Sequence, residues 1–241
     1  MARLYVPLPL TPGAQLELPA NPAAHVRARR LSVGDRVTLF DGNGGEHPST
    51  LLAIERRRIC VEVGPQQPTE RELPARVVLM LAVVKGERMD VAVEKATELG
   101  VGAIVPLLTE RTVVRLEKSA RAAKRRQHWR AVAASACEQC GRNRLPEIDE
   151  PRPLAQAWAT LDDAPARRLV LSLQAEEPLS TLTAATGTVL LIGPEGGLSN
   201  AELAAAAAHG FIPAAAGRRT LRTETAAIAA LSTVVSALGE L

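Results

Sequence analysis

The spacing of apolar residues along the chain changes near residue 72. Before this point, short apolar runs with polar neighbours predict β-strands over residues 3–6, 15–18, 35–40, 50–54 and 58–63. One helix is expected over residues 22–31, with Asn21 as its N-cap. Short strands separated by turns are typical of a small, mostly antiparallel β-barrel.

Residues 64–74 separate this region from the rest of the chain. They include Pro65, Pro68 and Pro74 and contain few apolar side chains, a composition typical of a linker. We therefore expect a first domain over residues 1–72 and a second domain over residues 73–241.

Beyond the linker, continuous apolar runs alternate with longer helical patterns. The runs predict strands that are buried on both faces of a parallel sheet, at residues 76–84, 169–173 and 188–192. Helices are expected over residues 89–99, 118–140 and 223–238. Gly100 is expected to end the first of these helices. Strands and helices in alternation predict an α/β fold for the second domain.

Composition narrows the classes of protein to which the chain can belong. Of its 241 residues, 46% are hydrophobic and 23% are charged, as in ordinary globular proteins. No apolar run approaches the roughly 20 residues of a membrane span, and the N-terminal residues do not have the pattern of a signal peptide. We expect a cytoplasmic protein without a membrane partner.

The three cysteines are too few for a disulfide framework and fit a reducing compartment. Cys137 and Cys140 have the C-x-x-C spacing that zinc sites and redox sites use. No second pair of cysteines and no suitably spaced histidine accompanies them. We therefore expect no metal site.

Most of the cations in the chain are arginines. The formal net charge is +3, the sequence pI is about 9.0, and lysine occurs at only four positions. Arginine binds phosphates and guanine edges well, but mutational bias alone also produces a chain rich in alanine and arginine. The positions of the cations, more than their number, therefore bear on RNA binding.

The segment with the most informative chemistry follows the run at residues 188–192. There a glycine-rich turn, GPEGGLS at residues 193–199, leads directly into a predicted helix. Ser199 and Glu202 have the spacing of a capping box, and Leu198 with Leu203 has that of a hydrophobic staple. The turn matches neither the dinucleotide fingerprint nor the phosphate-binding loop, so ligand binding and a purely structural turn both stay open.

Two further segments place polar groups at the ends of helices. At residues 217–227 a loop enters the last helix, and Arg222 lies where a cation is unfavourable for the helix dipole, which suggests an external partner for its guanidinium. At residues 136–146 a helix ends at Gly141, and Arg142 and Arg144 follow. The simpler interpretation of this second segment is a solvated helix end.

These segments together resemble one family, the RsmE-type methyltransferases of small-subunit (16S) rRNA, which belong to the SPOUT class and methylate N3 of uridine. The resemblance covers nearly the whole chain in the right order. It rests on GPEGGLS at residues 193–199, LRTETA at 221–226, EQCGRNR at 138–144, and KGERMD at 85–90 with EKATELGV at 94–101. Residues 25–35 and FDG at 40–42 resemble the PUA-like barrel of the family.

The resemblance implies a SPOUT α/β domain with a C-terminal trefoil knot, preceded by the PUA-like barrel. It also implies S-adenosylmethionine as the cofactor and a homodimer in which the second subunit completes the site. On matching positions, the cofactor-binding residues are Leu171, Ser172, Leu173, Ile192, Gly193, Pro194, Glu195, Gly196, Gly197, Leu198, Gly217, Leu221, Arg222, Thr223 and Thr225.

Methylation of N3 requires the uracil imide to lose a proton. We expect Arg222 to stabilise the negative charge that develops on the uracil oxygens, with Glu224 or Glu195 as an alternative catalytic group acting as the base. The partner is 16S rRNA, and because only 2% of residues are aromatic, base stacking is expected to contribute less to its binding than phosphate contacts. The expected RNA-binding residues are Arg3, Arg29, Arg30, Lys85, Arg121, Lys124, Arg125, Arg126, Gln139, Arg142 and Arg144.

Two other functions stay open at this point. A SPOUT enzyme that methylates the ribose 2′-oxygen would share the knot, but it would not share this set of motifs. A ribosome-assembly factor without catalytic activity would keep the barrel and the basic helix, but it would not bind the cofactor.

Overall fold

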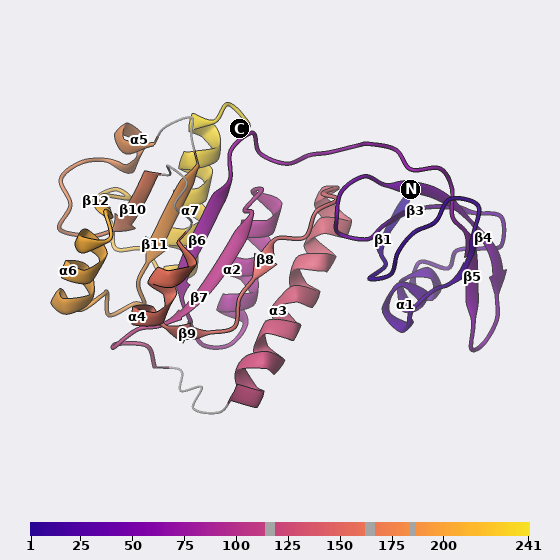
Figure 1. The fold of residues 1–241 in the computed structure, drawn as a ribbon, viewed down its shortest axis with the longest axis horizontal. Helices are drawn as coiled ribbons and strands as arrows, with labels where there is room; N and C mark the ends of the chain where they lie inside the picture. The colour runs from indigo at the N-terminus through magenta and orange to yellow at the C-terminus, as the bar shows by residue number, and fades with distance from the viewer. Residues whose placement is uncertain (114–118, 162–166, 184–186) are drawn as a thin grey trace. The chain divides into compact units, whose positions relative to one another are not determined.

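The structure is a computed structural model that describes residues 1–113, 119–161, 167–183 and 187–241 (Figure 1). The chain forms two compact units. The first consists of Met1–Glu72 and Ala134–Leu145, and the second consists of Leu73–Ala133 and Pro146–Leu241. Helix α3 (Ser119–Cys140) contributes residues to both units. Lys118, where this helix is predicted to begin, lies outside the described residues.

The first unit contains a five-stranded sheet in the order β1-β3-β4-β5-β2. The strand β1 pairs in parallel with β3, and the other neighbours are antiparallel. The apolar runs therefore predict these strands correctly, with small shifts of their ends. The strands are β1 (Ala2–Tyr5), β2 (Gln15–Glu17), β3 (Arg36–Phe40), β4 (His47–Ile54) and β5 (Ile59–Glu62).

Helix α1 (Ala20–Ala28) packs against this sheet through Ala23 and Val26, which join the apolar core of the first unit. Its N-cap is Pro19, so the prediction of Asn21 as the N-cap is wrong. The amide of Ala23 already donates to the carbonyl of Pro19, at 3.0 Å. Pro22 fits inside the first turn because an amide there would have no acceptor within the helix.

The second unit contains a parallel sheet in the order β12-β10-β11-β6-β7-β8, with β9 also paired to β7. The strand order reverses at β6, because β7 and β8 lie on one side of it and β11, β10 and β12 lie on the other. The strands are β6 (Val77–Ala82), β7 (Ala103–Leu108), β8 (Glu147–Ile148), β9 (Arg152–Pro153), β10 (Arg167–Leu171), β11 (Thr188–Ile192) and β12 (Ile212–Ala214).

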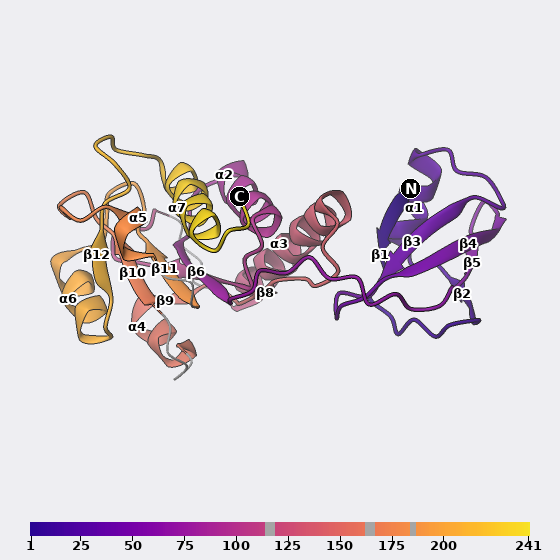
Figure 2. The same ribbon diagram turned by 90° about the horizontal axis from the view of Figure 1, so that it is seen from above.

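Helices cover both faces of this sheet, as the continuous apolar runs predict. Leu79 and Leu81 of β6 belong to the core shared with α2 (Glu87–Glu98) and α7 (Thr223–Ala237). Met80 faces a separate core that includes residues of α4 (Leu154–Ala157) and α6 (Asn200–Ala208). Figure 2 shows α2 and α7 on one side of the sheet and α4 on the other. The remaining short elements are η1 (Trp158–Thr160) and α5 (Leu179–Leu182).

Candidate functional site

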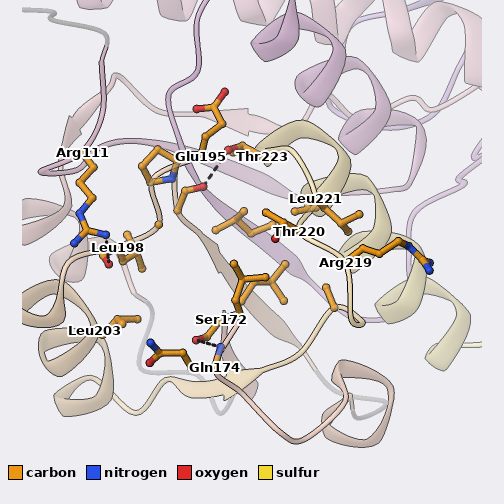
Figure 3. Close-up of a pocket in the computed structure, with 18 of the residues that line it drawn as sticks. Arg111, Ser172, Gln174, Glu195, Leu198, Leu203, Arg219, Thr220, Leu221 and Thr223 are labelled. Atoms are coloured by element: carbon orange, nitrogen blue, oxygen red, sulfur yellow. Dashed lines mark hydrogen bonds between the residues drawn. The ribbon is translucent and has the colours of Figure 1, made fainter.

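A cavity of about 340 Å³ lies in the second unit where the chain leaves β10, β11 and β12 (Figure 3). Its walls come from the end of β10 and the residues that follow it (171–174), from the glycine turn after β11, and from residues 216, 217, 219–221 and 223 after β12. In a parallel sheet the carboxyl ends of the strands meet at one edge, which is where such sheets bind their ligands. The volume falls in the range of roughly 300–1,000 Å³ that small-molecule sites occupy.

The glycine turn depends on glycine at two of its positions. The amide of Gly197 donates to the carbonyl of Pro194 at 2.8 Å, and Gly197 has a φ of +70°. A Cβ atom on Gly193 would lie 3.0 Å from Leu198 Cγ and 3.1 Å from Leu198 N. Replacing either Gly193 or Gly197 with a residue that has a side chain would therefore change the shape of the turn. A Cβ atom on Gly196 would make only ordinary contacts, with the side chain of Arg111.

Helix α6 begins with the capping box that the sequence predicts. The amide of Glu202 donates to Ser199 Oγ at 3.3 Å, and the amide of Ser199 donates to Glu202 Oε2 at 2.8 Å. Leu198 and Leu203 lie in the same apolar cluster, as expected for a hydrophobic staple. The end of the glycine turn is therefore fixed by its own helix.

Arg111 is a cavity residue that the sequence analysis did not identify. It follows β7, and its Nη1 donates to the carbonyls of Gly196, at 2.6 Å, and Leu198, at 3.5 Å. The amide of Glu110 donates to Glu202 Oε1 at 2.8 Å. The loop after β7 thus holds the glycine turn in place, in addition to helix α6. No local pattern distinguishes Arg111 from the other arginines of the chain.

The start of α7 also contacts the glycine turn. Thr223 is buried, and its hydroxyl donates to the carbonyl of Gly193 at 3.3 Å (Figure 3). Twelve of the fifteen predicted cofactor-binding residues line the cavity. The structure does not place the other three among the lining residues: Gly196, Arg222 and Thr225.

The three predicted catalytic residues have different surroundings. Arg222 is the N-cap of α7, and its exposed guanidinium has no hydrogen-bond or ion-pair partner among the described residues. Glu195 lines the cavity and forms an ion pair with Arg88, and Figure 3 shows its carboxylate turned away from Ser172. Glu224 is buried, and its Oε2 has no partner within the described ranges.

Most of the predicted RNA-binding residues are exposed, as such contacts require. The exposed ones are Arg29, Arg30, Lys85, Arg121, Lys124, Arg125 and Gln139. Arg126 is partly buried, and its Nε donates to the carbonyl of Ile148 at 2.8 Å. Arg144 is half exposed and pairs with Glu70.

Arg3 and Arg142 are instead held inside the first unit. Arg142 is only 3% exposed, and its guanidinium donates to both carboxylate oxygens of Glu72, at 3.0 and 2.5 Å. Arg3 pairs with Glu46 at 2.5 Å and also donates to Asn143. Arg142 therefore has no surface to offer to a phosphate, and Arg3 is held in the same internal network, so both are left out of the RNA surface proposed below.

Glu46 lies at the centre of this internal network. Burial alone would raise the pKa of its carboxyl group. The hydrogen bond and the charge of Arg3, together with the hydrogen bond from Asn143, instead hold this pKa below its ordinary value. The folded state therefore favours the carboxylate. Its contribution to stability is present above the pKa of the unfolded state, and it is lost as pH falls through the folded-state pKa.

We expect Glu46→Gln to lower the free energy of unfolding by about 1–3 kcal/mol at pH 7, because it leaves a partly buried Arg3 without its carboxylate. The difference from the unmodified protein should shrink as pH is lowered below about 4. Denaturant midpoints at the two pH values measure both effects. Glu55→Gln is the control, since Glu55 pairs with Arg58 at an exposed site and its loss should cost less than about 0.5 kcal/mol. Equal losses in the two variants would contradict the assignment.

The first thiol of the C-x-x-C segment lies inside the protein. Cys137 is buried, and this burial raises the pKa of its thiol to about 12. Its Sγ donates to the carbonyl of Arg144 at 3.5 Å. Within the described residues, no group of three or more His, Cys, Asp or Glu side chains could hold a metal ion. No helix in the described part of the chain is long and apolar enough to cross a membrane.

A parallel sheet with a ligand cavity beyond a glycine turn defines an α/β protein of the class that binds nucleotide-like cofactors at this edge. Comparison with known proteins narrows the class. The chain belongs to the RNA methyltransferase domain family, which matches residues 71–235, and the RNA methyltransferase PUA domain matches residues 23–64. It is therefore an RNA methyltransferase.

Named relatives agree with this assignment. The ribosomal RNA small subunit methyltransferase E of Buchnera aphidicola is 33% identical over 88% of this chain and 86% of its own length. Two solved structures each have a TM-score of 0.89, covering 98% of this chain and 97% of theirs. One is a methyltransferase from Legionella pneumophila with bound SAM, at 35% identity. The other is the ribosomal RNA small subunit methyltransferase E of Neisseria gonorrhoeae bound to S-adenosyl methionine, at 34% identity.

Proposed function

We propose that this protein uses S-adenosylmethionine to methylate N3 of a specific uridine in 16S rRNA, within the assembled small subunit. The observation that carries the proposal is the cavity at the carboxyl ends of β10, β11 and β12, in a chain similar over nearly its whole length to two structures solved with this cofactor. The relatives named for small-subunit rRNA supply the substrate class.

The residues of the cavity fit such a cofactor. Leu171, Ile192 and Leu198 give it apolar walls, while Gly193 and Gly197 let a ligand approach backbone groups closely. These residues, with Thr223 holding the turn to α7, would bind the adenosyl and methionyl groups. The bound cofactor supplies a methyl group on a positively charged sulfur.

In the reaction, the N3–H bond of uracil breaks as its proton passes to a base, a bond from N3 to the methyl carbon forms, and the bond between that carbon and the sulfur of the methyl donor breaks, so that S-adenosylhomocysteine leaves. Arg222 is the first choice for stabilising the uracil anion, because its guanidinium is exposed and unpaired within the described residues. Glu224 and Glu195 are the alternative acceptors of the N3 proton. Glu195 lines the cavity but is paired with Arg88, whereas Glu224 is not among the lining residues and its buried Oε2 has no partner in the described ranges.

The RNA surface is assigned to exposed and partly exposed cations. Phosphate contacts made by such residues set the affinity and the position of RNA without reading its sequence. The residues assigned to it are Arg29, Arg30, Lys85, Arg121, Lys124, Arg125, Arg126 and Arg144, together with Gln139.

The finer points of architecture belong to the same proposal. We assign a PUA-like barrel to residues 1–72 and a SPOUT domain with a C-terminal trefoil knot to residues 73–241. A homodimer is proposed because SPOUT sites are completed by a second subunit. A cytoplasmic location is proposed because small subunits are the substrate.

Small subunits from a strain that lacks this protein provide the test. Incubation with the purified protein and S-adenosylmethionine should add one methyl group to a single uridine of 16S rRNA. Mass mapping of nuclease fragments measures this, and omission of the cofactor is the control. A dinucleotide that resists nuclease would instead indicate a 2′-O-methyl group. If no methyl group is transferred and calorimetry detects no cofactor binding, a non-catalytic assembly factor becomes the better hypothesis.

A further inference from the structure

A second cavity, of about 260 Å³, adjoins the cavity described above. The two share Pro194 and Glu195 of the glycine turn in their walls. The second cavity is lined on its other sides by Lys85 and Arg88, at the start of α2, and by valines. A ligand in one cavity would thus be separated from a ligand in the other only by part of this turn.

The charged groups of the second cavity favour an anionic ligand. Arg88 forms an ion pair with Glu195, and the two side chains are 39% and 44% exposed. Lys85 is exposed and has no hydrogen-bond or ion-pair partner within the described residues. Two cations and one carboxylate therefore line this cavity, and the ammonium group of Lys85 is available to a ligand. An ammonium group is a common contact for phosphate.

The backbone beside Lys85 offers amide donors to a ligand. Gly86 is the N-cap of α2, with a φ of +65°, and no side chain caps the first turn of this helix. Uncapped amides at a helix N-terminus attract negative charge. A Cβ atom built on Gly86 would meet nothing within 4 Å, so the space next to these amides is open.

The remaining walls suit the flat face of a base. Val83 and Val84 follow β6 and are nearly fully buried, and Val113 comes from the loop after β7. The cavity is smaller than the roughly 300–1,000 Å³ that drug-sized ligands occupy. Its size and its mixture of apolar and cationic walls match one nucleotide better than a second cofactor.

We propose that the second cavity receives the target nucleotide of the RNA, with Lys85 binding its phosphate group and Arg88 facing the polar edge of its base. Glu195 then acts as a positioning residue that orients Arg88, which removes it from the candidate bases. The shared wall at Pro194 and Glu195 explains how a base in this cavity comes next to the methyl donor. This inference rests on the proposed function for the identity of the acceptor.

Steady-state methylation of unmodified small subunits tests the assignment. We expect Lys85→Ala and Arg88→Met to raise the KM for subunits roughly tenfold, with the affinity for S-adenosylmethionine unchanged within about twofold by calorimetry. Lys85→Arg should recover most of the loss because it keeps the charge. Lys95→Ala is the matched control, since Lys95 pairs with Glu94 and Glu98 on the same helix. An unchanged KM in both Lys85→Ala and Arg88→Met, or an equal loss of cofactor affinity, would overturn the proposal.

A binding measurement separates this proposal from the methylation itself. Uridine 5′-monophosphate, titrated at millimolar concentration and followed by NMR, should saturate the unmodified protein and the Lys95→Ala variant, but not the Lys85→Ala variant. This result would support the cavity even if no methyl group were transferred to 16S rRNA. Identical titration curves for the unmodified protein and Lys85→Ala would count against the nucleotide site, whatever the outcome of the methylation assay.

Discussion

Arg222→Ala should slow methyl transfer about a hundredfold or more while leaving S-adenosylmethionine affinity within a few-fold of its original value. Arg222 caps α7 without a side-chain capping bond, and its guanidinium has no partner among the described residues. A cation at a helix N-terminus is unfavourable for the helix. In the function proposed above, this guanidinium stabilises the negative charge on the uracil oxygens in the transition state, so its loss should slow the chemical step.

Single-turnover methylation of small subunits at saturating cofactor isolates this effect, because it separates chemistry from binding. Arg218→Ala is the matched control: Arg218 is exposed on the same loop and does not line the cavity. Its rate should stay within about twofold. A rate for Arg222→Ala equal to that of Arg218→Ala would make the residue structural. A collapse of cofactor affinity would place Arg222 in the binding loop instead.

Gly197→Val should lower the affinity for S-adenosylmethionine at least tenfold. A β-branched residue at a φ of +70° is strained by about 1–2 kcal/mol, and the turn can relieve this strain by moving the amide that Gly197 donates to Pro194. That movement would displace the wall of the cavity. A loss of about 1.4 kcal/mol of binding energy corresponds to the tenfold change.

Gly210→Val is the control for this substitution. Gly210 has a similar φ of +78°, a Cβ atom there would meet nothing within 4 Å, and it lies beyond the far end of α6 from the glycine turn. Both variants should lose similar amounts of thermal stability, and calorimetry should show that only Gly197→Val loses affinity. Equal affinities in the two variants would rule out this role for the turn.

The features that the sequence predicts well depend on neighbouring residues. Continuous apolar runs predict β6 and β11 because both faces of these strands are buried, and Ser199 with Glu202 predicts the start of α6 because the two groups lie one turn apart. The cap of α1 was missed for an equally local reason. The prediction places Pro22 at the first helical position, although a proline is tolerated anywhere in the first turn.

The remaining features depend on partners that are distant in the sequence. Arg111 lies 85 residues before Gly196, whose carbonyl it binds, and an arginine in such a loop has no distinguishing pattern. Arg142 and Arg121 look equally basic in the sequence, yet the first is buried against Glu72 and the second is exposed. The charge of a residue predicts its partner only after the fold has placed the two together.

The first unit is built from two segments that are distant in the sequence, and this limits which segments recombination can replace. Asn143 is buried there, and its amide donates to the carbonyl of Thr69 at 2.6 Å and to Glu46 at 3.3 Å. It belongs to Ala134–Leu145, a segment that comes 61 residues after Leu73, where the second unit begins. The N-terminal unit is therefore not a contiguous module. A recombination event that replaced residues 1–72 alone would separate Glu46 and Glu72 from Asn143 and Arg142, which bind them, so substitutions in the two segments are expected to be inherited together.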